Sequence, residues 1–185
     1  PPAPRSPDTM TITPANAARI ASKVRLLRFQ HLRPTVAVAR RLCVGGAGRT
    51  VLFVQRIRAA GDVPIALDER SIVREVAVRA GLTPDTAIGS IIDRLWLAGP
   101  LREAEWTIEA RLASAAEAAL LQVSVEMPVL VRSMSYVSRT GATVLIGQSV
   151  HRADLIRFSL RLPLRPPRRG GIPTAESDVS LEIAG

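Results

Sequence analysis

Hydrophobic and polar residues alternate along several stretches of this chain, a pattern typical of strands. The clearest case is residues 51–67, where two runs flank a Gly-Asp pair, which predicts two strands joined by a tight turn. Side chains two positions apart share one face of a strand, so Arg56 and Arg58 are expected to point the same way. Leu52 and Val54 are expected on that same face. An apolar face that ends in two guanidinium groups is either an exposed sheet edge or a pocket for an anion.

The same reasoning places the other elements of secondary structure. Further strands are predicted at residues 23–29, 106–112, 129–137 and 143–150. Helical spacing predicts helices at residues 34–42, 86–97 and 114–121. Thr83 or Asp85 is the expected N-cap of the second helix, and Ser114 forms a capping box with Glu117 in the third. Strands joined by hairpins, with helices between the hairpins, predict an α+β fold: an antiparallel β-sheet with helices packed on it.

Composition predicts how ordered the two ends of the chain are and what state the single cysteine is in. Prolines are dense in residues 1–22, which we interpret as a linker, and the chain from about Pro163 is expected to be unstructured, with 165–185 as a flexible tail. One cysteine, Cys43, excludes an internal disulfide and fits the cytoplasm; it is expected to be buried. No apolar run approaches the ~18 residues that a membrane span requires, so no membrane partner is expected.

Charge is distributed unevenly along the chain. The net charge is +9, but residues 1–58 contain 11 basic groups and one acidic group, Asp8, whereas residues 59–160 contain 10 basic and 12 acidic groups. A basic segment on a near-neutral body predicts proximity to a polyanion such as nucleic acid. The basic residues are almost all arginine. The alternative is therefore that the excess reflects a coding bias and that these charges are only solvated.

Five motifs in a fixed order resemble one family. They lie at residues 36–42, 54–67, 108–121, 127–130 and 149–158. Over roughly residues 23–164, the chain resembles the UTRA effector-binding domain of the HutC branch of GntR-type bacterial transcription regulators. The resemblance implies a chorismate-lyase-like α+β fold, a pocket for a small-molecule effector, and a homodimer. It also implies an N-terminal winged helix-turn-helix, which residues 1–22 are too short and proline-rich to contain, so DNA would be bound only through a missing N-terminal module.

The resemblance leaves three functions open, of which the third is a pure dimerisation module with a vestigial pocket. The first is a ligand-sensing and dimerisation domain of a regulator, with no cofactor. The second is an enzyme similar to chorismate pyruvate-lyase, which shares the fold and uses arginines for a dicarboxylate. The sequence has no metal-ligand cluster and no nucleophile motif, so the domain is predicted not to be an enzyme.

The resemblance also implies which residues form the site. In similar domains, arginines at the positions of Arg56 and Arg58 reach a phosphate or carboxylate of the ligand, which suits the fork of a guanidinium group. The alternative is that one of them pairs with Asp68 or Glu69 on the returning strand. Glu69 lies near an acidic pocket residue of the family, and a salt bridge is the other interpretation of it.

A second part of the site is expected on the last hairpin. Ser149 and His151 share a strand face with Gly147; His151 replaces an aromatic residue that contacts ligand in similar domains. Arg132, on the facing strand, is a further candidate to line the pocket. Leu145 stands where the family often has a glutamate, which predicts a more apolar ligand body.

Overall fold

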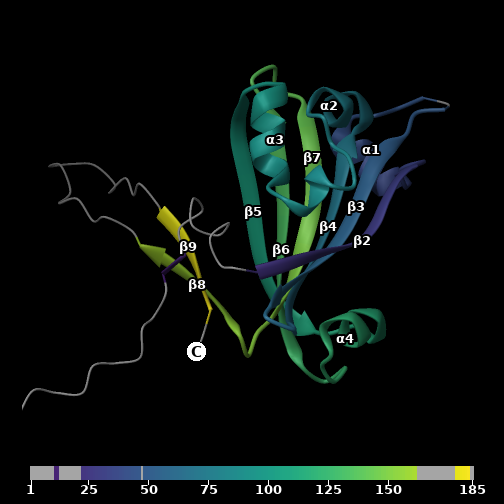
Figure 1. The fold of residues 1–185 in the computed structure, drawn as a ribbon. Helices are drawn as coiled ribbons and strands as arrows, with labels where there is room; N and C mark the ends of the chain where they lie inside the picture. The colour runs from purple at the N-terminus through teal and green to yellow at the C-terminus, as the bar shows by residue number, and fades with distance from the viewer. Residues whose placement is uncertain (1–10, 13–21, 47, 162–177, 184–185) are drawn as a thin grey trace, which may run out of the picture.

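The protein folds around an antiparallel sheet of six strands, in the order β2-β3-β4-β7-β6-β5. The computed structural model describes residues 11–12, 22–46, 48–161 and 178–183. The six strands are β2 (Ser22–Leu32), β3 (Val51–Ala60), β4 (Val63–Val73), β5 (Leu101–Leu112), β6 (Pro128–Ser138) and β7 (Thr143–Arg152). The predicted α+β class is therefore confirmed (Figure 1).

Helices cover both faces of this sheet. On one face lie α2 (Arg74–Arg79), the 3-10 turn η1 (Thr86–Ile88) and α3 (Ile91–Ala98), and their apolar side chains join those of the strands in one core. On the other face lie α1 (Val36–Leu42) and α4 (Ala115–Leu121). In Figure 1, α2 and α3 lie at one end of the sheet and α4 lies at the other.

The main core lies between the sheet and the α2–α3 layer. Leu52, Ile72 and Leu145 of the sheet are fully buried there against Ile91 and Leu95 of α3. Burial of a side chain of this size stabilises the fold by roughly 1.5–3 kcal/mol. The alternation predicted for the first hairpin is confirmed, since Leu52 and Val54 both belong to this core.

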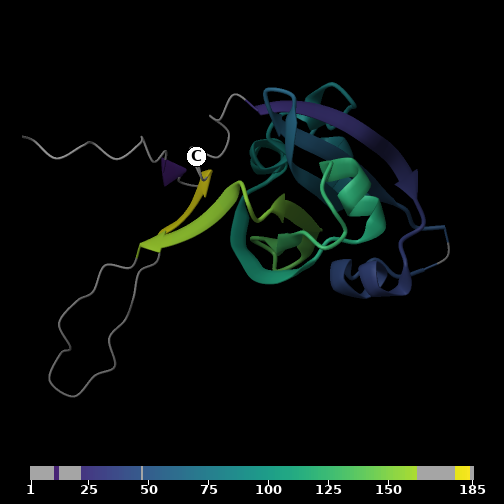
Figure 2. The ribbon, with the colours of Figure 1, turned by 90° about the horizontal axis from the view of Figure 1, so that it is seen from below.

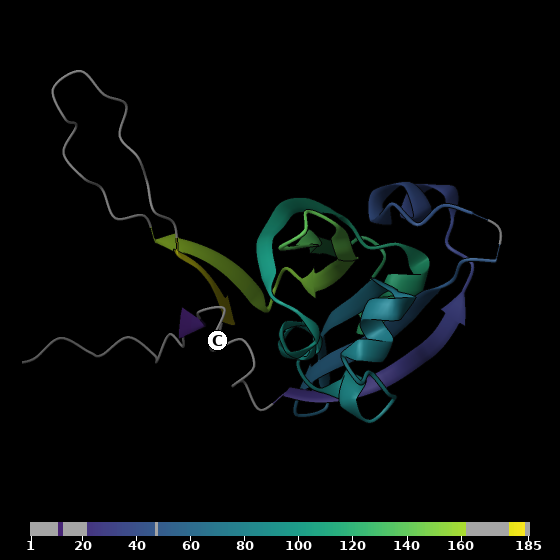
Figure 3. The same cartoon turned by 90° about the horizontal axis from the view of Figure 1, so that it is seen from above.

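A second, three-stranded sheet joins distant parts of the chain. It consists of β1 (Thr11–Ile12), β9 (Asp178–Ile183) and β8 (Ile156–Arg161), in that order. Figures 2 and 3 show β8 and β9 projecting to one side of the six-stranded sheet. The prediction that nothing regular follows Pro163 is wrong for 178–183, because those residues pair with β8.

Local side-chain chemistry accounts for the helix ends. The Thr35 hydroxyl accepts a hydrogen bond from the Val38 amide and so begins α1. The predicted capping box is present in α4, between Ser114 and Glu117. Cys43 ends α1 in the left-handed conformation, with φ of 53°, and it is exposed; the prediction that it is buried is wrong, because a helix end at the surface turns its side chain outward.

Two helical predictions also need correction. Residues 86–97 do not form one helix: Gly89 is extended, and Ser90 caps a new helix at Ile91. Helix α2 carries too short an apolar pattern to be predicted. None of the described helices is long and apolar enough to cross a membrane.

Candidate anion-binding site

Strand pairing brings four polar side chains into one row across the middle of the sheet. Arg56 of β3 is paired with Asp68 of β4, Asp68 with Ser149 of β7, and Ser149 with Arg132 of β6. Paired residues of neighbouring strands point to the same face, here the face that carries α2 and α3. The row therefore lies next to the main core.

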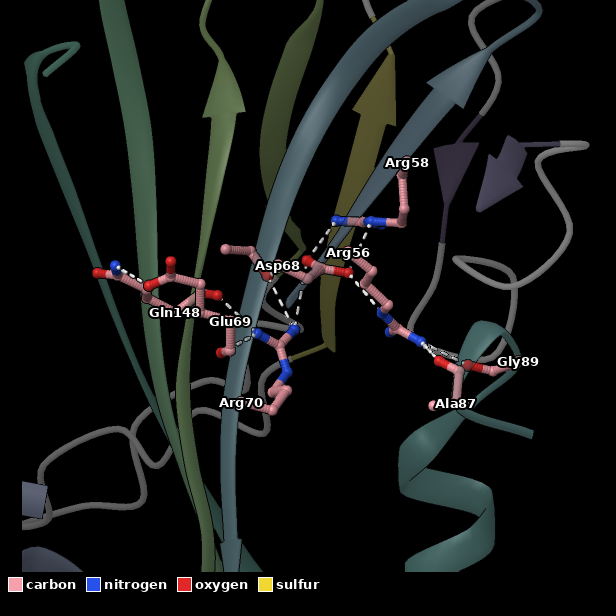
Figure 4. Close-up of polar contacts among 9 residues, drawn as sticks. Arg56, Arg58, Asp68, Glu69, Arg70, Ala87, Gly89 and Gln148 are labelled. Atoms are coloured by element: carbon pink, nitrogen blue, oxygen red, sulfur yellow. Dashed lines mark hydrogen bonds and ion pairs between the residues drawn. The ribbon is translucent and has the colours of Figure 1, made fainter. Parts of the chain in front are cut away.

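Asp68 is the centre of this polar cluster (Figure 4). Its Oδ2 lies 3.2 Å from the Nε of Arg56 and 3.2 Å from the Nε of Arg58. Its Oδ1 lies 3.4 Å from Nη2 of Arg70 and accepts a 2.6 Å hydrogen bond from the Ser149 hydroxyl. Three guanidinium groups thus share one carboxylate. The sequence-based alternative is that one of Arg56 and Arg58 pairs with Asp68 or Glu69, and the structure pairs both with Asp68.

The cluster is buried and carries excess positive charge. The side chains of Asp68 and Arg70 are 2% and 6% exposed, and that of Arg58 is 15% exposed. Burial alone would raise the pKa of Asp68, but the nearby charges of Arg58, Arg70 and Arg56, with the Ser149 hydrogen bond, bring it well below its usual range. Asp68 is therefore ionised and offsets one of the positive charges around it.

Arg56 also connects the cluster to the η1 turn. Its Nη1 donates to the backbone oxygens of Ala87 and Gly89, at 2.7 Å each, while its Nε donates to Asp68. Ala87 belongs to η1, so this side chain bridges the sheet and the η1 turn (Figure 4). Burial lowers the pKa of Arg56, and Asp68 opposes that effect.

Arg70 is the residue of the cluster that sequence reasoning missed. Its Nη1 donates to the backbone oxygens of Glu69 and Gln148, and its Nη2 donates to the Ser149 hydroxyl at 2.9 Å. Burial lowers its pKa to about 10. Its side chain crosses Gly147 of the paired strand, where a Cβ atom would lie 2.7 Å from the Arg70 Cδ. The sequence does contain one signal for Arg70: it lies two residues after Asp68 and therefore on the same strand face.

Several buried polar atoms beside this cluster have no hydrogen-bond partner among the described residues. They are the Nε of Arg58 and of Arg132, the indole Nε1 of Trp106, and both ring nitrogens of His151. Arg58 donates to Asp68 through its Nη2, at 3.3 Å, but its Nε, although within ion-pair distance of Asp68, does not point so as to make a hydrogen bond. Buried polar groups without partners are rare in folded proteins, so these atoms are candidates for contact with a bound water or a ligand.

Aromatic rings surround the Arg132 end of the site. The guanidinium carbon of Arg132 lies 4.5 Å from the ring centre of Trp106 and 6.0 Å from that of Phe158. Burial lowers the pKa of Arg132, and the nearby positive charge of Arg58 lowers it further. A nearby anion would relieve this effect, because an opposite charge favours the charged form of a guanidinium group.

His151 lies beside them as a neutral ring. It is fully buried and packs edge to face against Phe158, with ring centres 5.2 Å apart. Burial, together with the charges of Arg58 and Arg132, brings its pKa well below the usual value. A neutral imidazole offers one N–H donor and one acceptor.

The structure does not bring every predicted residue to this site. Glu69 lies on the opposite face from Asp68, because side chains alternate along β4, and it accepts hydrogen bonds from Gln55 and Gln148 at 2.8 and 2.9 Å. Ser149 is at the site, but its hydroxyl hydrogen is used by Asp68. Leu145 is fully buried in the main core.

The described side chains of the site include more guanidinium groups than carboxylates. Within the described residues, no three His, Cys, Asp or Glu side chains lie close enough together to hold a metal ion. The excess of guanidinium groups over carboxylates favours phosphate or carboxylate oxygens, which the arginine fork binds through paired hydrogen bonds.

The domain thus has a curved antiparallel sheet with helices on both faces, and it has a buried arginine cluster on one of these faces. The chain belongs to the UTRA domain family, whose family model matches residues 17–157. The prediction made from the five sequence motifs is thereby confirmed.

Solved structures of transcriptional regulators share the fold. The C-terminal domain of the histidine utilization repressor from Pseudomonas syringae pv. tomato matches with a TM-score of 0.65, at 21% identity over 71% of this chain and 92% of that chain. The effector domain of PhnF from Mycobacterium smegmatis also matches with a TM-score of 0.65, at 19% identity over 76% of this chain and 86% of that one. The possible transcriptional regulator YydK from Bacillus subtilis matches with a TM-score of 0.66, at 14% identity over 73% of this chain. The match spans 59% of YydK, so this chain corresponds to about three fifths of that protein.

Proposed function

We propose that this domain is the ligand-sensing and dimerisation part of a bacterial GntR/HutC-type transcription regulator, and that it binds a small anionic effector. The observation that carries the proposal is the group of buried nitrogen atoms without hydrogen-bond partners among the described residues, on Arg58, Arg132, Trp106 and His151. Membership of the UTRA family and the fold shared with the effector domain of PhnF support it.

Each side chain has a proposed role in binding. Arg58 and Arg132 bind the oxygens of a phosphate or carboxylate group, and His151 exchanges a hydrogen bond with the adjoining part of the effector. Ser149 and Asp68 have a supporting role: the Ser149 hydroxyl accepts from Arg70 and donates to Asp68. Arg56 is a positioning residue, because its hydrogen bonds go to Asp68 and to the backbone near η1. Glu69 is left out of the proposed contacts, since it faces away.

Regulation would follow from a shift between arrangements of a dimer. An effector shifts an equilibrium only through a difference in its affinity for the two states. The edge strand β5 supports a dimer, because nearly all of its residues are exposed, including Ile108 and Leu112. DNA would be bound by a winged helix-turn-helix in another part of the regulator. Sedimentation of the chain at several concentrations tests the dimer, and a monomer throughout would contradict it.

The anion site is tested by a thermal-shift screen of the 185-residue chain. The compounds are phosphorylated sugars, organic acids and amino-acid catabolites, each beside its uncharged analogue. A true effector at a hundredfold excess over its Kd stabilises the domain by about 2.7 kcal/mol. For a domain of this size, that corresponds to a rise in Tm of roughly 5–10 °C.

Two variants separate the site from general effects of charge. Arg58→Ala is expected to abolish the shift, whereas Arg102→Ala, on the exposed edge strand, is expected to leave it unchanged. The proposal fails if no anion stabilises the chain more than its uncharged analogue does, or if Arg58→Ala leaves the shift intact.

Catalysis is the second candidate function, and its test is direct. The chain is incubated with chorismate and the solution is assayed for 4-hydroxybenzoate. We expect none, and product formation above the buffer blank would overturn the regulator proposal.

A further inference from the structure

One stretch of the chain is free of acidic residues over a long span. Between Asp8 and Asp62 there is no aspartate or glutamate, whereas lysine and arginine recur throughout. In the described part of this stretch, Arg56 and Arg58 belong to the Asp68 cluster, and the other positive charges lie on β2, on α1 and in the segments on either side of α1. The outer surface around α1 is therefore cationic, with no acid of its own segment to offset it.

An open cleft of about 650 Å³ lies in this region, between α1 and the loop. Arg33 precedes α1, Arg40 lies in its last turn, and Arg49 follows the loop; all three line the cleft and all three are exposed. No acidic residue lines it. None of the ion pairs found among the described residues involves these three arginines.

The glycine residues that line the cleft have open space beside them. A Cβ atom placed on Gly45, Gly46 or Gly48 would meet nothing within 4 Å, so the loop presents bare backbone to the solvent. The Asp68 cluster differs in kind, because its side chains are buried. Exposed guanidinium groups along an open cleft instead match repeated phosphates, each of which one arginine fork can bind.

We propose that the surface formed by Arg33, Arg40 and Arg49 binds the phosphate backbone of DNA without reading its sequence. This surface acts independently of the effector site. It adds a second DNA contact, made by the effector domain itself, to the one expected from a helix-turn-helix. Phosphate contacts of this kind carry affinity and position the protein, whereas the bases are read elsewhere.

The test is a titration of the 185-residue chain with a fluorescently labelled 20-base-pair duplex, followed by anisotropy. Each phosphate contact steepens the dependence of log affinity on log salt by about 0.9. Three contacts therefore contribute a slope of about −2.7, which corresponds to a loss of roughly 40-fold in affinity between 50 and 200 mM salt. The triple variant Arg33→Gln, Arg40→Gln, Arg49→Gln is expected to lose that part of the slope.

A matched variant controls for net charge. Arg79→Gln, Arg94→Gln and Arg139→Gln remove the same charge from α2, α3 and the β6–β7 loop, none of which lines the cleft, and this variant is expected to keep the wild-type slope. Circular dichroism of both triple variants is the check that each of them is folded. The inference is overturned if both triple variants lose affinity equally, if the chain binds no duplex at 50 mM salt, or if polyglutamate of equal charge displaces the duplex at lower concentration than unlabelled duplex does.

Discussion

At the scale of single residues, Asp68 determines how the arginines around it can act. Its carboxylate holds Arg56 and Arg70, both of which also donate to backbone oxygens. Arg58 and Arg132 each keep a buried Nε–H without an acceptor. Asp68 thus pairs with Arg58 as well as with Arg56 and Arg70, but among the described residues only Arg56 and Arg70 are also bound to backbone oxygens.

His151 should make stability depend on pH in a defined window. Burial holds its pKa in the folded chain well below the unfolded value of about 6.5. The unfolded chain therefore takes up a proton first as pH falls, so stability decreases below about pH 6.5, by at most ~1.4 kcal/mol per pH unit.

The measurement is urea unfolding between pH 7.5 and 5 of the wild type, His151→Gln and His31→Gln. His31 is the other histidine of the chain and is exposed. We expect the slope of unfolding free energy against pH to flatten in His151→Gln alone. Equal slopes in the wild type and His151→Gln would show that His151 is not held neutral by burial.

At the scale of elements, alternation predicted β3, β4, β6 and β7 well because one face of each lies against a core. It placed Arg56 and Arg58 together on the face of Leu52 and Val54, as the structure has them. It did not predict α2, whose six residues are held by tertiary packing of Val76 and Ala77.

The contacts of Arg70 depend on pairing between distant strands. Arg70 lies opposite Gly147, 77 positions further along the chain, and a single sequence does not reveal that register. The same limit explains Glu69: its neighbours Gln55 and Gln148 come from two other strands, and only the pairing shows that they share the face turned away from Asp68. Sequence reasoning therefore finds the charged strand face but not all of its members.

A methyl group at Gly147 should disrupt this crossing of strands. The added Cβ would collide with the Glu69 backbone oxygen and press on the Arg70 side chain. We expect Gly147→Ala to lower the free energy of unfolding by roughly 1–3 kcal/mol, as overpacking does. Gly45→Ala is the control, because its Cβ would meet nothing within 4 Å. Chemical denaturation that finds the two variants equally stable would contradict the close approach at Gly147.

At the scale of the whole molecule, the two faces of the sheet carry different kinds of side chain. One face is covered by α1 and α4 over apolar clusters, and the other combines the main core with the arginine cluster. Arg56 joins that cluster to η1, and η1 leads into α3. An anion that draws Arg58 away from Asp68 would change the charge that Arg56 experiences, which gives the site a physical route to the helical layer.

The central claim is that an anion binds where Arg58, Arg132 and Trp106 hold buried N–H groups without acceptors. The most direct test is a proton–nitrogen correlation spectrum of the 185-residue chain, titrated with inorganic phosphate and with each anion that raises Tm. The chain has two tryptophans, and Trp96 is 52% exposed, so its indole N–H serves as an internal reference. We predict saturable shifts of the Trp106 indole N–H and of the Arg58 and Arg132 Nε–H signals, while Trp96 stays in place. A stabilising anion that leaves these three signals unmoved would contradict the claim.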